Sequence, residues 1–534
     1  MLYLVPSITK MAVSIMSTSG MNQEPSKSSS VGAPKGYVPG SDQAPPDGMP
    51  VIPDSIPVTT KAPPVKPSIR QPITSSLGTS LDQVLSAHQT FFDRGATLSL
   101  EARLGTLNRL KTVIKRYESR IIDALRKDLN KPEAEAYISE VGFVLDEIKM
   151  AEKSLKKWMA PKRIKTPMTM SPARSYTQSE PLGRVLIVSP WNYPFQLLIG
   201  PMVGAIAAGN VMTLKPSEMS VETTNLIVEM IKENFDESLI SIFEGGADVS
   251  KALMDKPWAH IFFTGSTAVG RLVAGAAAKN LSPVTLELGG KSPVIIDQSA
   301  KLKIAAKRTV WGKFFNAGQT CIAPDYVLIH ESLKDAFVQE AAKAVKALFG
   351  QDPEASPDFG RIINKKHFDR LVNLLPNANT LVGGTTSRDS LYISPTIVDG
   401  VGLDHPVMKE EIFGPILPVI AFNQIEEVFT IVRSMDRPLA LYLFAESKEI
   451  QSRIFEQISF GGGCINDTIM HCANTNMPFG GVGGSGVGAS HGKAGFDAFS
   501  HQKSVMVNPT MIDMPLRYQP YSGWKLKLFR ALIG

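Results

Sequence analysis

Two short stretches of the sequence hold side chains that can form and break covalent bonds. "NAGQTCIAP" (316–324) holds Cys321, one of three cysteines in the chain. "LELGGKSP" (286–293) places Glu287 in an apolar strand before a Gly-Gly turn. Burial would raise the pKa of this carboxylate toward a range useful for a general base. A cysteine of ordinary pKa needs a base or nearby donors to act as a nucleophile. The two stretches therefore suit covalent catalysis by a thiol.

Both residues also have simpler structural interpretations. A free cysteine is most often a small buried hydrophobe, and a buried glutamate can belong to an ion pair that only stabilises the fold. A third stretch, "SPWNYPF" (189–195), holds Asn192 between two prolines. Its amide can donate to a developing oxyanion, although turn asparagines are common.

A fourth stretch, "FFTGSTAVG" (262–270), suits a phosphate group. Gly265 follows a predicted strand, and Ser266 to Gly270 open a helix. Backbone N–H groups at a helix N-terminus attract a pyrophosphate. The full GxGxxG fingerprint is missing, so a tight strand-to-helix turn stays an alternative.

Two further stretches carry carboxylates next to turns. "TLKPSE" (213–218) puts Lys215 and Glu218 after a predicted parallel strand, at the edge where such sheets bind ligands. Lys215 can bond ribose hydroxyls or a phosphate, whereas Glu218 accepts from a ribose hydroxyl and disfavours a 2′-phosphate. A capped helix start explains the same residues. "EEIFGP" contains Glu411 and Phe413 and can be read as a turn alone.

Alternating strands and helices must position these residues. From residue 183, short apolar strands alternate with amphipathic helices up to about 286, which indicates a parallel sheet covered on both faces. Three helices are predicted before it, within 80–95, 99–129 and 133–159, from apolar spacings of three and four. A second α/β region runs from about 287 to 491. The predicted fold class is therefore α/β.

The bulk composition is that of a soluble globular protein. Hydrophobic residues make up 43% and charged residues 20%, and the net charge of +6 is spread without a basic block, so nucleic acid is not implied. Three cysteines without a CxxC pair argue against disulfides and structural zinc, and we expect no metal. Residues 1–78 hold 13 of the 38 prolines and are predicted to be a disordered tail. We expect no transmembrane helix.

The six stretches, together and in order, resemble the aldehyde dehydrogenase superfamily over roughly residues 80–510. "CIAPDY", "NDTIMH", "MPFGGVGGSG" and "SHGKAGFDAFSHQK" are similar to its class 3 and fatty aldehyde dehydrogenase branch. The resemblance implies these roles: Cys321 as nucleophile; Asn192 with the Cys321 N–H as oxyanion hole; Glu287 as general base; Lys215 and Glu218 at the adenosine ribose; Gly265, Ser266 and Gly270 by the pyrophosphate; Glu411 at the nicotinamide ribose; Phe413 near its ring.

The resemblance also implies a domain plan. A Rossmann-type NAD-binding domain would comprise residues 79–160 and 181–286, followed by an α/β catalytic domain at 287–491. A small β bridging unit would combine 161–180 with 492–512 and support a homodimer. Residues 513–534 would form a C-terminal tail with an amphipathic helix.

The implied reaction is the oxidation of apolar aldehydes to carboxylic acids. Glu287 favours hydrolysis, because relatives that pass the acyl group to coenzyme A generally lack it. We expect long-chain fatty aldehydes first, with apocarotenoid or aromatic aldehydes as the runner-up and an inactive scaffold as the alternative from another class. Glu218 favours NAD, but class 3 relatives with a glutamate there can use both cofactors, so NADP stays open.

Two departures from the branch stand out. A tyrosine commonly precedes the histidine of "HGK", and here Ser490 stands before His491. The membrane-spanning C-terminal helix of many fatty aldehyde relatives is replaced by "YSGWKLKLFRALIG". There, Trp524 and Phe529 share an apolar face that Lys525 interrupts. We expect a cytoplasmic enzyme whose C-terminal helix either touches an intracellular membrane or packs on a partner subunit.

Overall fold

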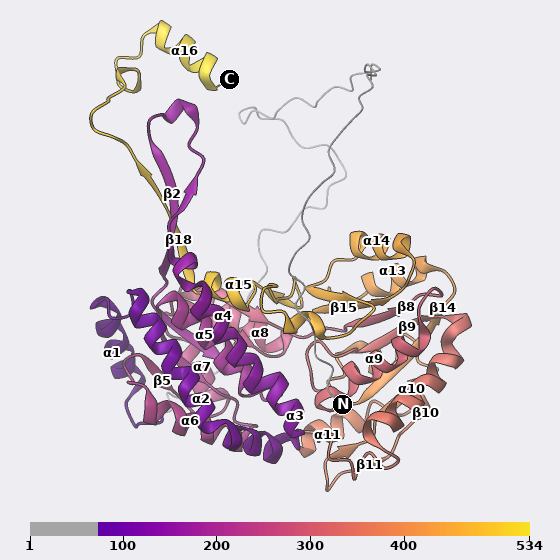
Figure 1. Ribbon diagram of the computed structural model, residues 1–534. Helices are drawn as coiled ribbons and strands as arrows, with labels where there is room; N and C mark the ends of the chain where they lie inside the picture. The colour runs from indigo at the N-terminus through magenta and orange to yellow at the C-terminus, as the bar shows by residue number, and fades with distance from the viewer. Residues whose placement is uncertain (1–72, 534) are drawn as a thin grey trace, which may run out of the picture. The chain divides into compact units, whose positions relative to one another are not determined.

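The computed structural model describes residues 73–533 (Figure 1). Residues 73–78, predicted as part of the disordered tail, are ordered instead. The backbone N–H of Ser76 donates to the Ile242 carbonyl (2.9 Å), and its hydroxyl donates to Glu244 (2.8 Å). These bonds tie the segment to the end of a strand, a contact that composition alone does not reveal. The remaining part of the predicted tail, 1–72, lies outside the described residues.

The predicted N-terminal helices form. Ser99 caps the longest by accepting from the Ala102 N–H (3.1 Å), and Asn130 ends it in a left-handed conformation (φ 49°). The third predicted helix contains a π-helical turn, η1 (Tyr137–Val141), between two α-helical parts. The helices are α1 (Leu81–Asp93), α2 (Leu100–Leu129), α3 (Glu133–Ala136) and α4 (Gly142–Met159).

The first sheet has strand order β17-β7-β6-β3-β4-β5. Its strands are parallel except β17, which runs antiparallel beside β7 and pairs Gly486 with Glu287. Both residues fall inside the range predicted for the catalytic domain, yet they complete this sheet. The strands are β3 (Arg184–Val188), β4 (Val211–Lys215), β5 (Ile240–Ile242), β6 (His260–Thr264), β7 (Val284–Glu287) and β17 (Gly486–Val487).

Helices cover this sheet as the alternation predicts. α5 is almost entirely apolar and packs against α2 and α4, and it ends at Gly209 in a left-handed conformation (φ 90°). A side chain at Gly209 would lie 2.8 Å from the Arg103 guanidinium, so glycine is needed there. The covering helices are α5 (Gln196–Ala208), α6 (Val221–Asn234), α7 (Ala247–Met254) and α8 (Thr267–Lys279).

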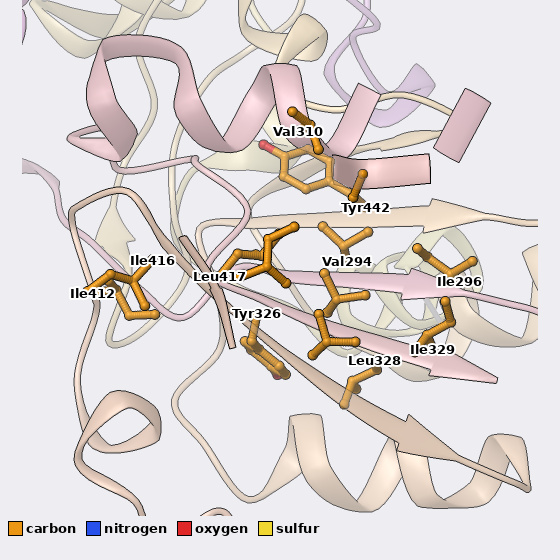
Figure 2. Close-up of a cluster of buried hydrophobic side chains, with 14 of the residues drawn as sticks. Val294, Ile296, Val310, Tyr326, Leu328, Ile329, Ile412, Ile416, Leu417 and Tyr442 are labelled. Carbon is orange, nitrogen blue, oxygen red and sulfur yellow. The ribbon is translucent and has the colours of Figure 1, made fainter. Parts of the chain in front are cut away.

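The second sheet has order β10-β13-β14-β9-β8-β15-β16 and is parallel except at β10. Its apolar strands pack into the largest core of the described residues, where Tyr326 and Tyr442 are fully buried (Figure 2). The strands are β8 (Pro293–Ile296), β9 (Tyr326–His330), β10 (Asn379–Val382), β13 (Thr396–Asp399), β14 (Ile416–Phe422), β15 (Ala440–Phe444) and β16 (Gly462–Ile465). A small hairpin, β11 (Thr386–Ser387) with β12 (Tyr392–Ile393), lies apart from this sheet.

Helices around the second sheet complete that region. They are α9 (Leu302–Phe314), α10 (Lys334–Phe349), α11 (Lys365–Val372), α12 (Pro406–Lys409), α13 (Ile425–Arg433) and α14 (Lys448–Gln457).

The two segments of the predicted bridging unit meet in one antiparallel sheet. β2 (Arg174–Pro181) lies between β1 (Lys162–Ile164) and β18 (Ser500–Val507). Helix α15 (Gly492–Ala498) precedes β18 and packs against α4 and α5. The domain boundaries themselves stay predictions.

The C-terminal helix α16 (Gly523–Ile533) forms, with Trp524, Leu528 and Ile533 exposed. Lys525, expected to interrupt the apolar face, turns to the preceding segment and donates to the carbonyls of Pro515 (3.2 Å) and Tyr518 (2.9 Å). Within residues 73–533 no helix combines the length and hydrophobicity that a membrane span requires.

Candidate active site

The loop before Cys321 is a left-handed corner. Asn316, Ala317 and Gly318 have φ values of 52°, 50° and 75°, a conformation that side chains rarely adopt. A side chain at Gly318 would lie 2.3 Å from the Gly414 carbonyl oxygen. The corner therefore packs closely against the turn after Phe413, and this contact fixes the position of Cys321.

Hydrogen bonds join this loop to the one that carries Asn192. The Asn192 amide donates to the Gln319 carbonyl (2.9 Å), while the Asn192 carbonyl accepts from the Asn316 amide (2.9 Å). The Tyr193 hydroxyl bonds Thr320 (2.6 Å). One N–H of the Asn192 amide is used in this way, and its second N–H stays available for an oxyanion.

An ion pair behind Asn192, which the sequence did not reveal, holds that loop. The Lys131 ammonium and the Glu140 carboxylate bond each other and are fully buried. Lys131 also donates to the Asn192 carbonyl (3.3 Å). Glu140 lies in the π-helical turn η1 and accepts the backbone N–H groups of Phe195 (2.9 Å) and Gln196 (3.1 Å) at the start of α5. Removing either partner would leave an uncompensated buried charge.

Glu287 ends β7, between β6 and β17, and is 5% exposed. Its Oε1 accepts from the Ser490 hydroxyl (3.0 Å), whereas Oε2 has no hydrogen-bond partner within the part of the chain that the structure describes. Burial raises the pKa of Glu287 to about 8, against a smaller lowering by the Ser490 hydrogen bond. A carboxylate with one free oxygen and a raised pKa can accept a proton from water.

Burial raises the pKa of the Cys321 thiol well above its usual range, and the carboxylates of Glu411 and Glu287 act in the same direction. The thiol is therefore protonated at neutral pH in this state. It becomes a nucleophile only when a base removes its proton or a positive charge arrives beside it.

Four predicted residues lie around the start of α8 and the end of β4. Ser266 caps α8 by accepting from the Val269 N–H (3.4 Å). The Lys215 ammonium is buried and bonds the half-exposed Glu218 carboxylate (2.9 Å). Gly265, Ser266, Lys215 and Glu218 all line one groove.

Gly270 does not line that groove, and its predicted place by the pyrophosphate stays a prediction. A side chain there would lie 2.5 Å from Leu288. The glycine allows α8 to pack closely on the turn after β7.

Glu411 lies directly over Gly289, where a side chain would come within 1.9 Å of its Oε2. A buried ion pair that the sequence did not reveal holds the segment that carries Glu411 in place. Lys291 bonds Asp325 and the carbonyls of Val407 (2.9 Å) and Glu410 (3.0 Å). Burial raises the pKa of Glu411 to about 8.

Two residues further on, the ring of Phe413 packs edge-on against the ring of Trp191, with centroids 5.4 Å apart.

The groove has a volume of about 1880 Å³ and gathers nine of the ten predicted site residues, with Gly270 the exception. Its lining suits a dinucleotide, because the N-terminus of α8 can bind a pyrophosphate and the carboxylates of Glu218 and Glu411 can accept hydrogen bonds from ribose hydroxyls. Cys321, Asn192 and Glu287 line the same groove.

The family model for the aldehyde dehydrogenases matches residues 63–505. This chain belongs to the aldehyde dehydrogenase family. Several relatives of this aldehyde dehydrogenase carry names of family 3 members, in agreement with the class 3 resemblance. The chain is therefore an oxidoreductase acting on aldehydes, and the family uses NAD(P).

Individual relatives match nearly over their whole length. The chain is 46% identical to a 4,4'-diaponeurosporen-aldehyde dehydrogenase of Staphylococcus aureus over 84% of its own length and 98% of the relative. It is 42% identical to a dog protein named dimeric NADP-preferring aldehyde dehydrogenase, over 82% and 98%. A solved structure, the substrate-bound state of a Staphylococcus aureus AldH, has a TM-score of 0.84 at 45% identity and covers 85% of this chain and 99% of its own. The α/β aldehyde dehydrogenase fold is thus confirmed.

Proposed function

We propose that this enzyme oxidises apolar aldehydes through covalent catalysis by Cys321. The observation that carries the proposal is the buried Glu287, which lines the groove that also holds the thiol and has one carboxylate oxygen without a hydrogen-bond partner within residues 73–533. A purely structural glutamate would have both oxygens paired. An inactive scaffold would need none of Cys321, Asn192 and Glu287.

The proposed chemistry has two halves. The Cys321 thiol gives its proton to a base as its sulfur attacks the aldehyde carbon, and the oxyanion accepts hydrogen bonds from the Asn192 amide and the Cys321 N–H. The bound cofactor supplies the hydride acceptor, which leaves an acyl thioester on the cysteine. Glu287 then takes a proton from water as the water oxygen attacks the acyl carbon. The carbon–sulfur bond breaks and the carboxylic acid leaves.

Two variants test these roles. Cys321→Ala should abolish NADH formation, because no other thiol in the groove can accept the acyl group. Glu287→Gln should retain acylation but slow deacylation, and stopped flow should then show a burst of NADH before a slow steady state. An unchanged steady-state rate in Glu287→Gln would remove it from the base role.

We infer a long apolar substrate, with fatty aldehydes first. Apocarotenoid aldehydes are the second candidate, supported by the name of the Staphylococcus aureus relative. A kinetic panel from short aliphatic to fatty and polyene aldehydes tests both. Higher kcat/KM for short polar aldehydes would refute the apolar class, and no NADH from any aldehyde would favour the scaffold.

Cofactor preference is proposed to be NAD. Glu218 is paired with Lys215 at the ribose end of the groove, and its charge disfavours a 2′-phosphate. The dog relative's name argues for NADP in that protein. Running the aldehyde panel with both cofactors measures the preference, and a lower KM for NADP would overturn it.

We also propose a cytoplasmic homodimer that touches membranes through α16. The dog relative's name supports the dimer, and Trp524 and Ile533 are exposed beside Lys527 and Arg530 on a helix without acidic residues. Liposome flotation of the full chain and of a chain truncated before Ser522 tests the membrane contact. Identical behaviour of the two would exclude it.

A further inference from the structure

A second cavity lies among α4, α5 and α15, which pack together (Figure 1), and Glu287 is one of its lining residues. We call it the rear cavity. Leu197, Thr264 and Glu287 line both this cavity and the groove. The general base therefore stands in the wall between the two spaces.

Four buried polar atoms without a hydrogen-bond partner belong to residues that line the rear cavity. They are Glu287 Oε2, Thr264 Oγ1, Glu147 Oε1 and His491 Nδ1. Buried polar groups are nearly always bonded to protein or to ordered water. A cavity of about 30 Å³ holds roughly two waters, so ordered water is the partner that fits all four atoms.

Glu147 is held with one oxygen free. Its Oε2 accepts from the Gly492 N–H (2.9 Å) and its side chain is almost wholly buried. Gly492 has φ 46°, and a side chain there would lie 2.2 Å from the Thr475 carbonyl oxygen, which fixes the donor that anchors the carboxylate. The half-exposed Trp158, Gln196 and Gly200 complete the cavity wall, so solvent lies close to that side.

The titratable groups around the cavity are poised for proton transfer. Burial raises the pKa of Glu147 to about 7, with the Gly492 N–H lowering it and the neighbouring Asp146 carboxylate raising it. Burial and nearby His471 lower the pKa of His491 to about 4, so its ring is neutral at pH 7. Glu147 is thus ionised in a large fraction of molecules at neutral pH and can accept a proton.

We propose that Glu147 receives, through water in the rear cavity, the proton that Glu287 takes from the hydrolytic water. The proposal rests on the base role of Glu287 and adds the route by which the base is regenerated. In this step the proton leaves Glu287, crosses the cavity water to Glu147 and passes to solvent. One proton moves and no oxidant or reductant is required. Glu147 touches neither substrate nor cofactor, so it is a relay residue.

Glu147→Gln tests the route, because the amide keeps an oxygen for the Gly492 N–H but cannot relay a proton. Acyl-enzyme is formed in a single turnover, and its decay is followed by intact-protein mass spectrometry at pH 6–9. We expect NADH to form in the single turnover at the rate of the unmodified enzyme, deacylation to be slowed about tenfold or more at pH 7, and the rate to recover in part as the concentration of imidazole buffer rises. Loss of packing alone would not respond to buffer.

Glu152→Gln is the matched control, since Glu152 lies on the same helix but pairs with Lys111 away from the cavity. It should leave deacylation unchanged. If Glu147→Gln does not fold, Thr264→Val is used in its place, because it removes an unpaired hydroxyl with little change of shape. Thr264→Val should slow deacylation severalfold. Normal deacylation in whichever cavity variant folds would overturn the relay. Absence of NADH formation in a single turnover of the unmodified enzyme would instead refute the proposed function.

Discussion

Within residues 73–533, the Ser490 hydroxyl is the one protein group that donates to the Glu287 carboxylate, so Ser490→Ala should alter the pH dependence of deacylation. Ser490 donates to Glu287 Oε1 over 3.0 Å inside a buried site. Its backbone stays anchored in the variant, because its carbonyl accepts from the Phe479 N–H (3.0 Å). The substitution therefore removes one hydrogen bond with little movement of the chain.

The size of the effect follows from that bond. A hydrogen bond to a charged group contributes about 1.5–3 kcal/mol, and it favours the ionised form of Glu287. Each 1.4 kcal/mol is a factor of ten, so the ionised fraction at neutral pH should fall about 10- to 100-fold. The pKa of Glu287 is raised to about 8, and a base works only when ionised. Deacylation should therefore rise with pH through about 8 in the unmodified enzyme and through a higher pH in the variant.

The assay is acyl-enzyme decay in single turnovers from pH 6 to 10. The loss of deacylation rate in Ser490→Ala, relative to the unmodified enzyme, should be largest near pH 6–7. The deacylation rates of the two proteins should converge at high pH. Ser490→Thr keeps the hydroxyl and should follow the unmodified profile. A uniform loss of rate at every pH, or coincident profiles for Ser490→Ala and the unmodified enzyme, would refute the link between this hydroxyl and the pKa of the base.

Two further substitutions test the groove. Asn192→Ala should lower kcat about 10²- to 10³-fold, the usual effect of losing one oxyanion donor, with cofactor affinity retained in a fluorescence titration; a loss below threefold would exclude Asn192 as that donor. Gly289→Ala places a methyl group 1.9 Å from Glu411 Oε2, so it should displace that carboxylate and weaken cofactor binding at least tenfold by the same titration. Gly105→Ala, with open space around it and outside the groove, should bind the cofactor normally, and equal affinities of the two alanine variants would contradict the ribose role of Glu411.

Strand ends could be predicted from the sequence because apolar runs followed by turn residues mark them. Lys215, Glu287 and Asn192 were found in this way, each at or after a predicted strand. Their convergence follows from a parallel sheet, in which such ends share one edge. The order of motifs then identified the family, which periodicity alone does not do.

The supporting residues could not be predicted by the same reasoning. Lys131 stands in "NKPEAEAY", a polar run that resembles a solvated loop, yet its ammonium is fully buried. Its partner Glu140 lies nine positions away, but the loop it supports begins some fifty residues later. Gly270 stands in a phosphate-like motif, yet in the structure it also lies against Leu288 and lets α8 pack closely on the turn after β7. Long-range contacts decide such cases, and spacing along the chain does not encode them.

Ser490 shows how the geometry changes the meaning of a departure from a family pattern. From the sequence alone, a serine in place of the tyrosine predicts a change in the shape of the substrate site. In the structure its hydroxyl donates to Glu287, the proposed general base, which lines both the groove and the rear cavity. A tyrosine side chain is too large to occupy the same place without filling part of that cavity. The consequence of the serine should therefore appear in proton transfer and its pH dependence before it appears in the choice of aldehyde.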